Sequence, residues 1–347
     1  MKKTFITAIC LALSWFCGAI SASAATSDWA PRASNNDDQY VTLGAQLGYL
    51  NGNSTYHTSF YDYTGSGGES KLEFPLQTEL AGVTGEFVNK NSRTGDTFKL
   101  RITWLTNVGN GSGKMKDSDW LTDDQDVNTP TVGAGYPHPG KDIYSESDIK
   151  LKAAILDIRA VYAAASHPGV NLGLVGGYIR RNYHYTVSNT NQVGYGPYAP
   201  NYIGFIPGNT LDYDVTYDIP YIGFHSEFEG GNDLLASLDL GYSPLVTVTD
   251  KDDHLLRYKR STGETTGEAY LAGLGATWNI SPDDVFRATF ETMRVLTRGT
   301  QKQTWYRDIT DPQTNQIVIP AGATISGIDD RITSTQTTIM FLFTHRL

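Results

Sequence analysis

Apolar and polar residues alternate along several segments of this chain, and this pattern limits the folds that the chain can adopt. From position 270 to position 280 every second residue is apolar, whereas most residues between them are glycine, threonine or asparagine. The segments 98–104 and 286–291 alternate in the same way. A period of two places successive side chains on opposite faces of a β-strand. The sequence therefore predicts strands with one apolar and one polar face.

The connections between the predicted strands are unequal in length. About ten strands follow from the alternation, beginning near Gln39, Lys71, Thr97, Asp148, Asn171, Asp214, Asp233, Glu268, Val285 and Ile332. The connections after even-numbered strands are short, at about 89–96, 166–170, 229–233 and 281–284, and those after odd-numbered strands are long, at about 53–69, 109–146, 188–211, 249–267 and 299–331. This asymmetry is typical of outer-membrane barrels. We predict an all-β fold, a ten-stranded antiparallel transmembrane β-barrel with long extracellular loops and short periplasmic turns.

The composition argues against other classes of protein. The chain has 37 acidic and 27 basic residues and a formal charge of −10. Because basic residues are not in excess, no nucleic-acid partner is predicted. Aromatic residues make up 12% of the chain, which is too many for a disordered protein. A soluble lipocalin-like barrel is the alternative fold, but it would need apolar residues inside, whereas the charged residues here share a face with glycine and threonine.

The first residues have the pattern of an export signal. Lys2 and Lys3 precede an apolar run, Phe5–Ile20, and Ala22–Ala24 has the small residues of a cleavage site. No later stretch has the ~20 consecutive apolar residues of a membrane-spanning helix. The predicted organisation is a signal peptide at residues 1–24, a flexible periplasmic lead-in at 25–38 and a single ten-stranded β-barrel domain at 39–347.

Two acidic clusters lie in the predicted long loops. Met115–Trp120 follows the third strand, and Asp250–His254 follows the seventh. In an extended backbone Asp117 and Asp119 point to one side, as do Asp252 and His254. The third and seventh strands are four positions apart in a ring of ten, so we expect the two pairs to face each other across the barrel mouth, about 10 Å apart.

These residue types suit the activation of a water molecule. A histidine that is oriented by a carboxylate can take a proton from water near neutral pH. A second pair of carboxyls across the gap can hold that water and share a proton. The spacing alone also allows ordinary acidic turns or a weak calcium site. No glycine-rich phosphate loop, zinc-spaced His/Cys set or nucleophile elbow is present, so neither a metal nor an organic cofactor is predicted.

Both clusters resemble the signature segments of the omptins, the outer-membrane proteases of Gram-negative bacteria. Further similarity lies in Gly173–Tyr178 (GLVGGY) and Pro220–Gly223 (PYIG), and the match runs in order through most of the chain. The resemblance implies a ten-stranded barrel in the outer membrane of a Gram-negative bacterium, with an active site that faces the exterior. It also implies endoproteolysis by an activated water molecule, without a covalent intermediate.

The resemblance assigns roles to individual residues. Asp252 and His254 correspond to the activating dyad of the family, and Asp117 and Asp119 to the opposing aspartate couple. Asp250 corresponds to one of two acidic residues that bind a basic side chain before the cleaved bond. The expected partners are therefore cationic polypeptides, outer-membrane lipid and lipopolysaccharide, which omptins need as an activator, and the protein is expected to be a monomer.

The chain departs from the family at two binding sites. The second acidic pocket residue belongs in the first long loop, where an ungapped comparison reaches Tyr56 and His57; Asp62 and Glu69 lie nearby. At the lipopolysaccharide site, Arg180 replaces an acid, and Asn182 and Thr216 stand in place of arginines. An alternative phosphate-binding set on the outer surface consists of Arg180, Arg181 and Lys259.

Two other groups are interpreted from the predicted strands. Lys150 and Lys152 are expected to be lumen charges that pair with acids such as Asp157 or Glu291. A cluster of tyrosines is expected in the aromatic girdle or in the packing of the third long loop, with an adhesive or substrate-binding surface as the alternative. These tyrosines are Tyr183, Tyr185, Tyr195, Tyr198 and Tyr202.

The sequence thus predicts an omptin-like aspartic-type endopeptidase that cleaves next to basic residues. Its main alternative is a catalytically silent barrel of the same ancestry that acts as a surface adhesin or structural protein. A narrow channel is a third possibility. Side chains that reach in from both walls of a ten-stranded barrel fill its middle, which disfavours free diffusion of solutes.

Overall fold

The computed structural model describes residues 39–61, 67–91, 96–122, 141–167, 169–195, 203–230 and 233–347. The predicted signal peptide and lead-in lie outside the described residues. Within the described ranges, no helix is long and apolar enough to cross a membrane. The strands are β1 (Gln39–Tyr61), β2 (Gly67–Pro75), β3 (Thr78–Lys90), β4 (Thr97–Val108), β5 (Lys114–Thr122), β6 (Ile143–His167), β7 (Val170–Gly194), β8 (Ile203–Glu229), β9 (Leu234–His254), β10 (Lys259–Asn279), β11 (Asp284–Trp305), β12 (Ile309–Thr310), β13 (Ile317–Ile319) and β14 (Thr324–Arg346).

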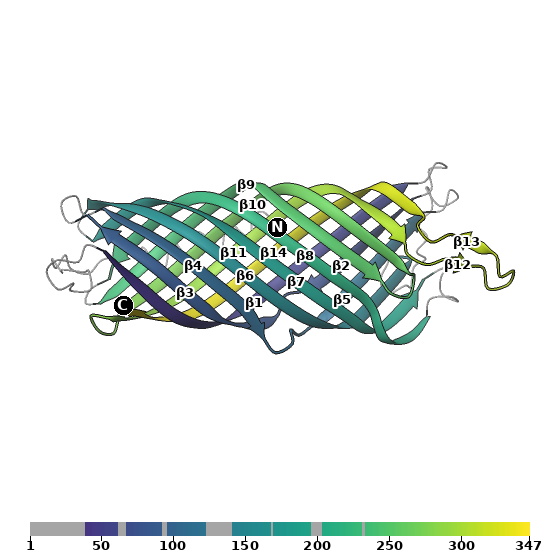
Figure 1. Ribbon diagram of the computed structural model, residues 1–347, viewed down its shortest axis with the longest axis horizontal. Helices are drawn as coiled ribbons and strands as arrows, with labels where there is room; N and C mark the ends of the chain where they lie inside the picture. The colour runs from purple at the N-terminus through teal and green to yellow at the C-terminus, as the bar shows by residue number, and fades with distance from the viewer. Residues whose placement is uncertain are drawn as a thin grey trace.

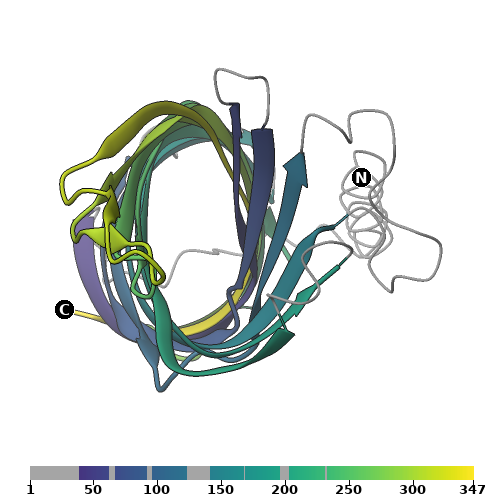
Figure 2. The ribbon, with the colours of Figure 1, turned by 90° about the vertical axis from the view of Figure 1, so that its right-hand side faces the viewer.

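Twelve of these strands form one closed antiparallel sheet. β1 pairs along its length with β14 on one side and with β3 and then β2 on the other. β4 and β5 likewise follow one another along β6. The twelve strands therefore occupy ten positions around the ring, which is visible end-on in Figure 2. The predicted ten-stranded barrel is confirmed.

The strands are much longer than a membrane requires. β8 has 27 residues and β9 has 21, whereas about ten residues span a bilayer. The predicted loop 249–267 contains the end of β9, a turn at 255–258 and the start of β10, so its assignment to a long loop was wrong. The hairpins keep pairing above the bilayer because each added residue satisfies its backbone groups in the neighbouring strand.

The two ends of the barrel differ. One end carries the connections 91–96, 168–169, 230–233 and 280–283, and we call it the lower end; the other, with the β12–β13 hairpin, is the upper end (Figure 1). Around the lower half, large apolar side chains point outward and are exposed, as expected of a surface in contact with lipid. They include Leu43, Leu47, Val83, Ile102, Trp104, Leu174, Ile222, Phe224, Leu240, Tyr270, Phe290, Ile339, Phe341 and Phe343.

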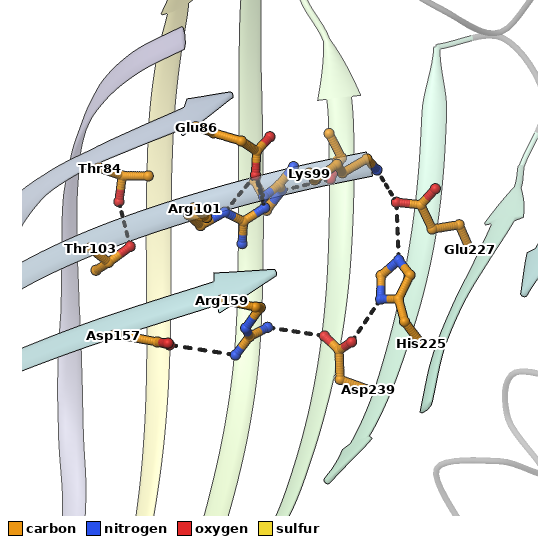
Figure 3. Close-up of polar contacts among 12 residues, drawn as sticks. Thr84, Glu86, Lys99, Arg101, Thr103, Asp157, Arg159, His225, Glu227 and Asp239 are labelled. Atoms are coloured by element: carbon orange, nitrogen blue, oxygen red, sulfur yellow. Dashed lines mark hydrogen bonds and ion pairs between the residues drawn. The ribbon is translucent and has the colours of Figure 1, made fainter. Parts of the chain in front are cut away.

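A network of ion pairs fills the lumen of the lower half (Figure 3). Arg159 contacts Asp239 at 3.1 Å, Glu291 at 2.9 Å and Asp157 at 3.6 Å. On the far side of Asp239, His225 continues the chain of contacts at 2.7 Å. Each carboxylate in this set therefore has a cation or an imidazole beside it, which offsets part of the cost of taking it out of water.

The lysines predicted to pair with these acids do not do so. Lys150 and Lys152 are exposed on the outer surface, because Leu151 between them is fully buried and successive residues of a strand point to opposite faces. Arg159 supplies the cation instead. The predicted lumen role of the two lysines is wrong.

Aromatic rings fill the barrel above the ion pairs. Phe74 stacks on Tyr213 with ring centroids 4.4 Å apart and lies 4.9 Å from Tyr185. Tyr183 and Tyr217 form an edge-on pair at 6.0 Å. Because Tyr183 and Tyr185 are fully buried inside the barrel, their predicted place in an aromatic girdle is wrong; Tyr198 and Tyr202 lie outside the described residues. This aromatic layer and the ion pairs disfavour a channel.

The ion-pair network predicts a stability effect. Arg159→Met leaves the carboxylates of Asp239 and Glu291 without their guanidinium, and should reduce the free energy of unfolding by about 3 kcal/mol. The measurement is a urea titration of the folded band on semi-native gels. Arg180→Met, at an exposed arginine, is the control and should shift the midpoint little. Equal midpoints for both variants would contradict a stabilising role for the network.

Candidate active site

The end of β9 directs three of the predicted site residues into the upper lumen. Asp250, Asp252 and His254 alternate with outward residues and so share the inner face of the strand. Asp252 lies between Tyr213 of β8 and Ser261 of β10 in the ladder. The turn at 255–258 begins directly after the histidine and connects β9 to β10. A paired strand on each side therefore holds these residues in place.

Asp252 and His254 are in contact. The histidine Nε2 lies 2.9 Å from the aspartate Oδ2. Asp252 is 1% exposed, whereas the histidine side chain is 21% exposed. The carboxylate is thus buried behind the imidazole, and the imidazole remains accessible from the cleft. The contact is at an ion-pair distance without hydrogen-bond geometry, and a carboxylate at this distance favours the imidazolium form of the ring.

Asp117 and Asp119 lie on β5, which is a strand above the membrane belt and not the loop that was predicted. Both are partly buried, and Ser70 of β2 donates a 3.5 Å hydrogen bond to Asp117. Burial and the neighbouring charge of Asp119 raise the pKa of Asp117 well above its ordinary value, and Asp252 adds to this effect. The couple is therefore suited to hold a proton at a pH where an ordinary aspartate has lost it.

One residue of each predicted pair lines a common cleft. Asp117 and His254 both line it, although β5 and β9 are four positions apart in the ring. The charge of Asp252 also acts on Asp117, as the shift in its pKa indicates. The other walls are formed by Leu72, Met115, Ser145, Ser147, Val187, Thr190, Gln192, Ile206, Thr210, Leu211, Leu256 and Arg257. The structure thus brings together the four residues that the sequence singled out.

Two cations that the sequence did not assign to the site also lie here. Arg257, in the turn after β9, lines the cleft and opposes the rise in the pKa of Asp117. Lys259 is opposite His254 in the hairpin, and burial together with Arg257 lowers its pKa, while the three nearby aspartates act in the opposite direction. Its predicted place on an outer phosphate-binding surface is wrong.

The other members of that predicted set divide between the two faces of the barrel. Arg181 is buried and donates to Gln336 in the lumen, so it cannot bind a phosphate on the outer surface. Arg180 is exposed and lies 3.4 Å from Asp218. Among the described residues, no group of three or more His, Cys, Asp or Glu side chains is arranged to hold a metal ion.

A second pair of acidic residues lies beside the dyad. Asp250 approaches Asp330 of β14 over Gly263 of β10. An ideal Cβ built on Gly263 would be 2.3 Å from Oδ1 of Asp250 and 2.4 Å from Oδ2 of Asp330, so the two oxygens lie within about 5 Å of each other. Any larger residue at position 263 would collide with both carboxyls. The sequence prediction did not find Asp330, because the last strand was expected to begin near Ile332.

These two carboxyls have no cationic partner among the described residues. Asp250 is 6% exposed and Asp330 is 3% exposed, and no described cation lies beside them; the contacts of backbone amides and of the two carboxyls with each other do not meet hydrogen-bond geometry and offset their burial only in part. Burial and the charge of its neighbour raise the pKa of Asp250 to about 8, and burial raises the pKa of Asp330 to about 7. Two carboxyls at this separation share one proton because ionising both is costly.

Comparisons of the sequence and of the structure with known proteins relate this chain to the same group of proteins. The sequence model of the Omptin family matches residues 33–312. Plasminogen activator of Yersinia pestis is 25% identical over 299 residues, which cover 84% of this chain and 85% of that protein. The crystal structure of the outer membrane protease OmpT from Escherichia coli aligns with a TM-score of 0.69 at 16% identity, over 92% of this chain and all of that one. This structural likeness concerns the fold.

The shared proton predicts a pH-dependent change in stability. Because folding raises both pKa values, this pair contributes most to stability at low pH, and the contribution falls as the pH rises from about 4, the ordinary aspartate value, to about 8. Asp330→Asn removes this repulsion and should raise the free energy of unfolding by about 2 kcal/mol at pH 9, and by less at pH 5. Thermal unfolding followed by gel mobility measures the change. Asp329→Asn, at the exposed neighbour, is the control; equal midpoints for the two variants at pH 9 would contradict the prediction.

Proposed function

The chain belongs to the omptin family, and we propose that it is an endopeptidase in which Asp252 and His254 activate the attacking water. The family and the barrel fold identify an outer-membrane protein of a Gram-negative bacterium and support the protease class of hydrolases. The observation that carries the proposal is the convergence of Asp117 and His254 on one cleft from strands four positions apart. The ion pair of His254 with Asp252 completes it.

In the proposed mechanism, water adds directly to the peptide carbonyl. His254 takes a proton from the water, and Asp252 stabilises the imidazolium that forms. The hydroxide attacks the carbonyl carbon, and the proton then passes from the imidazolium to the leaving amine as the C–N bond breaks. Asp117 and Asp119 hold the water from the opposite wall. No covalent intermediate and no metal or organic cofactor takes part.

The proposed substrate is a polypeptide with a basic residue before the cleaved bond. Asp250 lies two residues before Asp252 on the same face of β9, so a cationic side chain bound to it places the following bond beside the dyad. The formal charge of −10 attracts cationic polypeptides, and this attraction weakens with salt. The Yersinia pestis relative is named for action on another protein, which agrees with a polypeptide substrate.

We propose that the cleft faces the cell exterior and that the protein acts as a monomer. The apolar belt surrounds the lower half of the barrel, and the cleft lies in the upper half, beyond the belt. The short connections at the lower end are those of a periplasmic side. A polypeptide in the medium would then reach the dyad without crossing the membrane.

Lipopolysaccharide is the proposed activator. Arg298 of β11 is directly opposite Arg331 of β14, and both side chains are exposed above the apolar belt. Neither forms an ion pair with another described residue. Like charges directly opposite each other in a sheet are destabilising. A phosphate group between the two guanidiniums would convert the repulsion into two charge-assisted contacts.

The alternative function is a surface adhesin without catalysis. The β12–β13 hairpin at the upper end exposes Ile317 and Val318, which could contact another surface (Figure 1). An adhesin would bind its target equally well after the dyad is altered. The dyad variants below therefore distinguish the two functions.

Altering the dyad should abolish cleavage. Asp252→Asn and His254→Ala are each expected to lower kcat/KM for a fluorescence-quenched Arg-Arg peptide by about 1000-fold, because proton transfer from water is lost. The assay uses refolded protein with added lipopolysaccharide. Asp214→Asn, on the outer face of the adjacent strand β8, is the matched control and should remain close to wild type. Cleavage that survives both dyad variants, with the barrel still heat-modifiable on gels, would assign the activity to other residues.

The arginine pair predicts how lipopolysaccharide activates the protein. A double variant, Arg298→Gln with Arg331→Gln, should need about tenfold more lipopolysaccharide for half-maximal activity, because two charge-assisted contacts to phosphate are lost. Lys90→Gln, an exposed cation at the lower end, should leave the titration unchanged. An unaltered titration in the double variant would place the activator elsewhere, and activity that never depends on lipopolysaccharide would remove it as an activator.

A further inference from the structure

We propose that Asp330 is the second carboxyl of the pocket that binds the basic side chain before the cleaved bond, where it acts together with Asp250. The inference rests on the proposed function and adds a specificity-determining residue to it. Asp330 belongs to β14, the last strand of the barrel, far from the first long loop where the second acid was expected.

The carboxyls of Asp250 and Asp330 come together at Gly263, which is the first support for the inference. The carboxyls of Asp250 and Asp330 approach the same point above this glycine, and a Cβ there would lie within 2.4 Å of both. The two acids come from β9 and β14, on either side of β10 and β11. Because Gly263 has no side chain, two carboxyls from separate strands can converge at this position and present acceptor atoms to the same point.

The second support is that Asp250 and Asp330 have no cationic partner within the described part of the barrel. In the lower lumen, Arg159 lies beside three carboxylates, whereas no described cation forms an ion pair with Asp250 or Asp330, and no described side chain other than the opposing acid contacts their oxygens as a hydrogen-bond partner. A buried carboxylate without a partner is costly. A guanidinium or ammonium group from a substrate would satisfy both carboxyls and displace their shared proton. The electrostatic attraction between such a cation and these carboxyls is stronger than at an exposed acid, because the surroundings exclude water.

Two tyrosines provide walls for the alkyl part of a long side chain. Tyr56 and Tyr213 are fully buried, with ring centroids 5.7 Å apart, and the charges of Asp250 and Asp330 contribute to raising the pKa of both phenols. The hydroxyl of Tyr213 has no hydrogen-bond partner among the described residues and can accept a bond from a cation. Aromatic walls beside paired carboxyls suit arginine or lysine.

The residues near the position expected from the family do not supply the second acid. Tyr56 occupies that place on β1 and donates a 2.7 Å hydrogen bond to Gln301 of β11. His57 is on the opposite face of the strand, 3.4 Å from Glu69, whose side chain is 52% exposed. Asp62 lies outside the described residues. Glu69 therefore belongs to the outer surface, whereas Asp330 is inside the barrel and next to Asp250.

The distance to the dyad agrees with this role. At a rise of about 3.4 Å per residue, Asp250 lies about 7 Å from Asp252 along β9. A long basic side chain that reaches the two carboxyls leaves its own backbone level with the dyad. A short or neutral side chain cannot make these contacts, so the pocket selects by both length and charge.

The test measures a ratio of substrates. Two quenched peptides differ only at the residue before the cleaved bond, which is arginine in one and its neutral isostere citrulline in the other. For Asp330→Asn we expect the ratio of kcat/KM values, arginine over citrulline, to fall at least tenfold, as for the loss of a charged contact. Asp329→Asn removes the same charge from an exposed neighbour and should keep the wild-type ratio. A wild-type ratio in Asp330→Asn, with arginine still preferred, would overturn the role of Asp330 and leave the endopeptidase proposal intact.

A binding measurement keeps the inference testable without catalysis. p-Aminobenzamidine, a fluorescent amidinium, is titrated into the otherwise unaltered protein and into the Asp330→Asn and Asp329→Asn variants. Binding that is weakened at least tenfold only by Asp330→Asn supports the pocket, even if no peptide is cleaved and the endopeptidase proposal fails. Binding that is absent in all proteins, or equal in all of them, overturns it. Loss of folding is not expected to confuse the result, because Asp330→Asn should stabilise the barrel.

Discussion

The closure of the backbone hydrogen-bond ladder, from β14 onto β1, is the constraint on which the rest of this structure depends. Every strand of the twelve-stranded sheet then has a partner on both sides, and no edge of it remains exposed to lipid. Closure also determines which side chains face the lumen, since alternate residues of each paired strand must point inward. Because the ladder continues above the membrane belt, it holds Asp117 and Asp252 on rigid strands. The cleft is therefore built from the wall of the barrel and not from flexible loops.

The buried carboxyl groups of the lower and upper lumen have different surroundings. In the lower half, Arg159 lies among three carboxylates, and these contacts favour a fully formed barrel. In the upper half, Asp250 and Asp330 are more deeply buried than these carboxylates but have no described cation beside them. Their proximity costs stability that the paired half and the aromatic layer must offset. Unfavourable electrostatics that persist in an otherwise well-paired structure are typical of binding and catalytic sites.

The sequence was sufficient for the ring of strands and for the facing of the two acidic clusters, because both follow from alternation and from the order of connections. It was not sufficient for the face on which particular residues lie. A shift of one residue in a strand reverses every side chain, and Lys150 and Lys152 were therefore assigned inward although Leu151 between them is the buried residue. Strand length was also underestimated, because a bilayer sets a minimum length and no maximum. Asp330 was consequently assigned to a loop.

The position of Asp330 links the proposed preference for a basic residue to the closure of the barrel by β14. β14 pairs with β1 and β11, so the strand that seals the barrel also brings this carboxyl over β11 to Gly263. Neither partner in the acidic pair is near the other in sequence, and no local pattern could have joined them. A barrel that had paired all strands except β1 with β14 would contain the dyad on β9 but would hold Asp330 on an unfixed edge. Recognition of a basic residue would then require complete closure, whereas contact between Asp252 and His254 would require only β9.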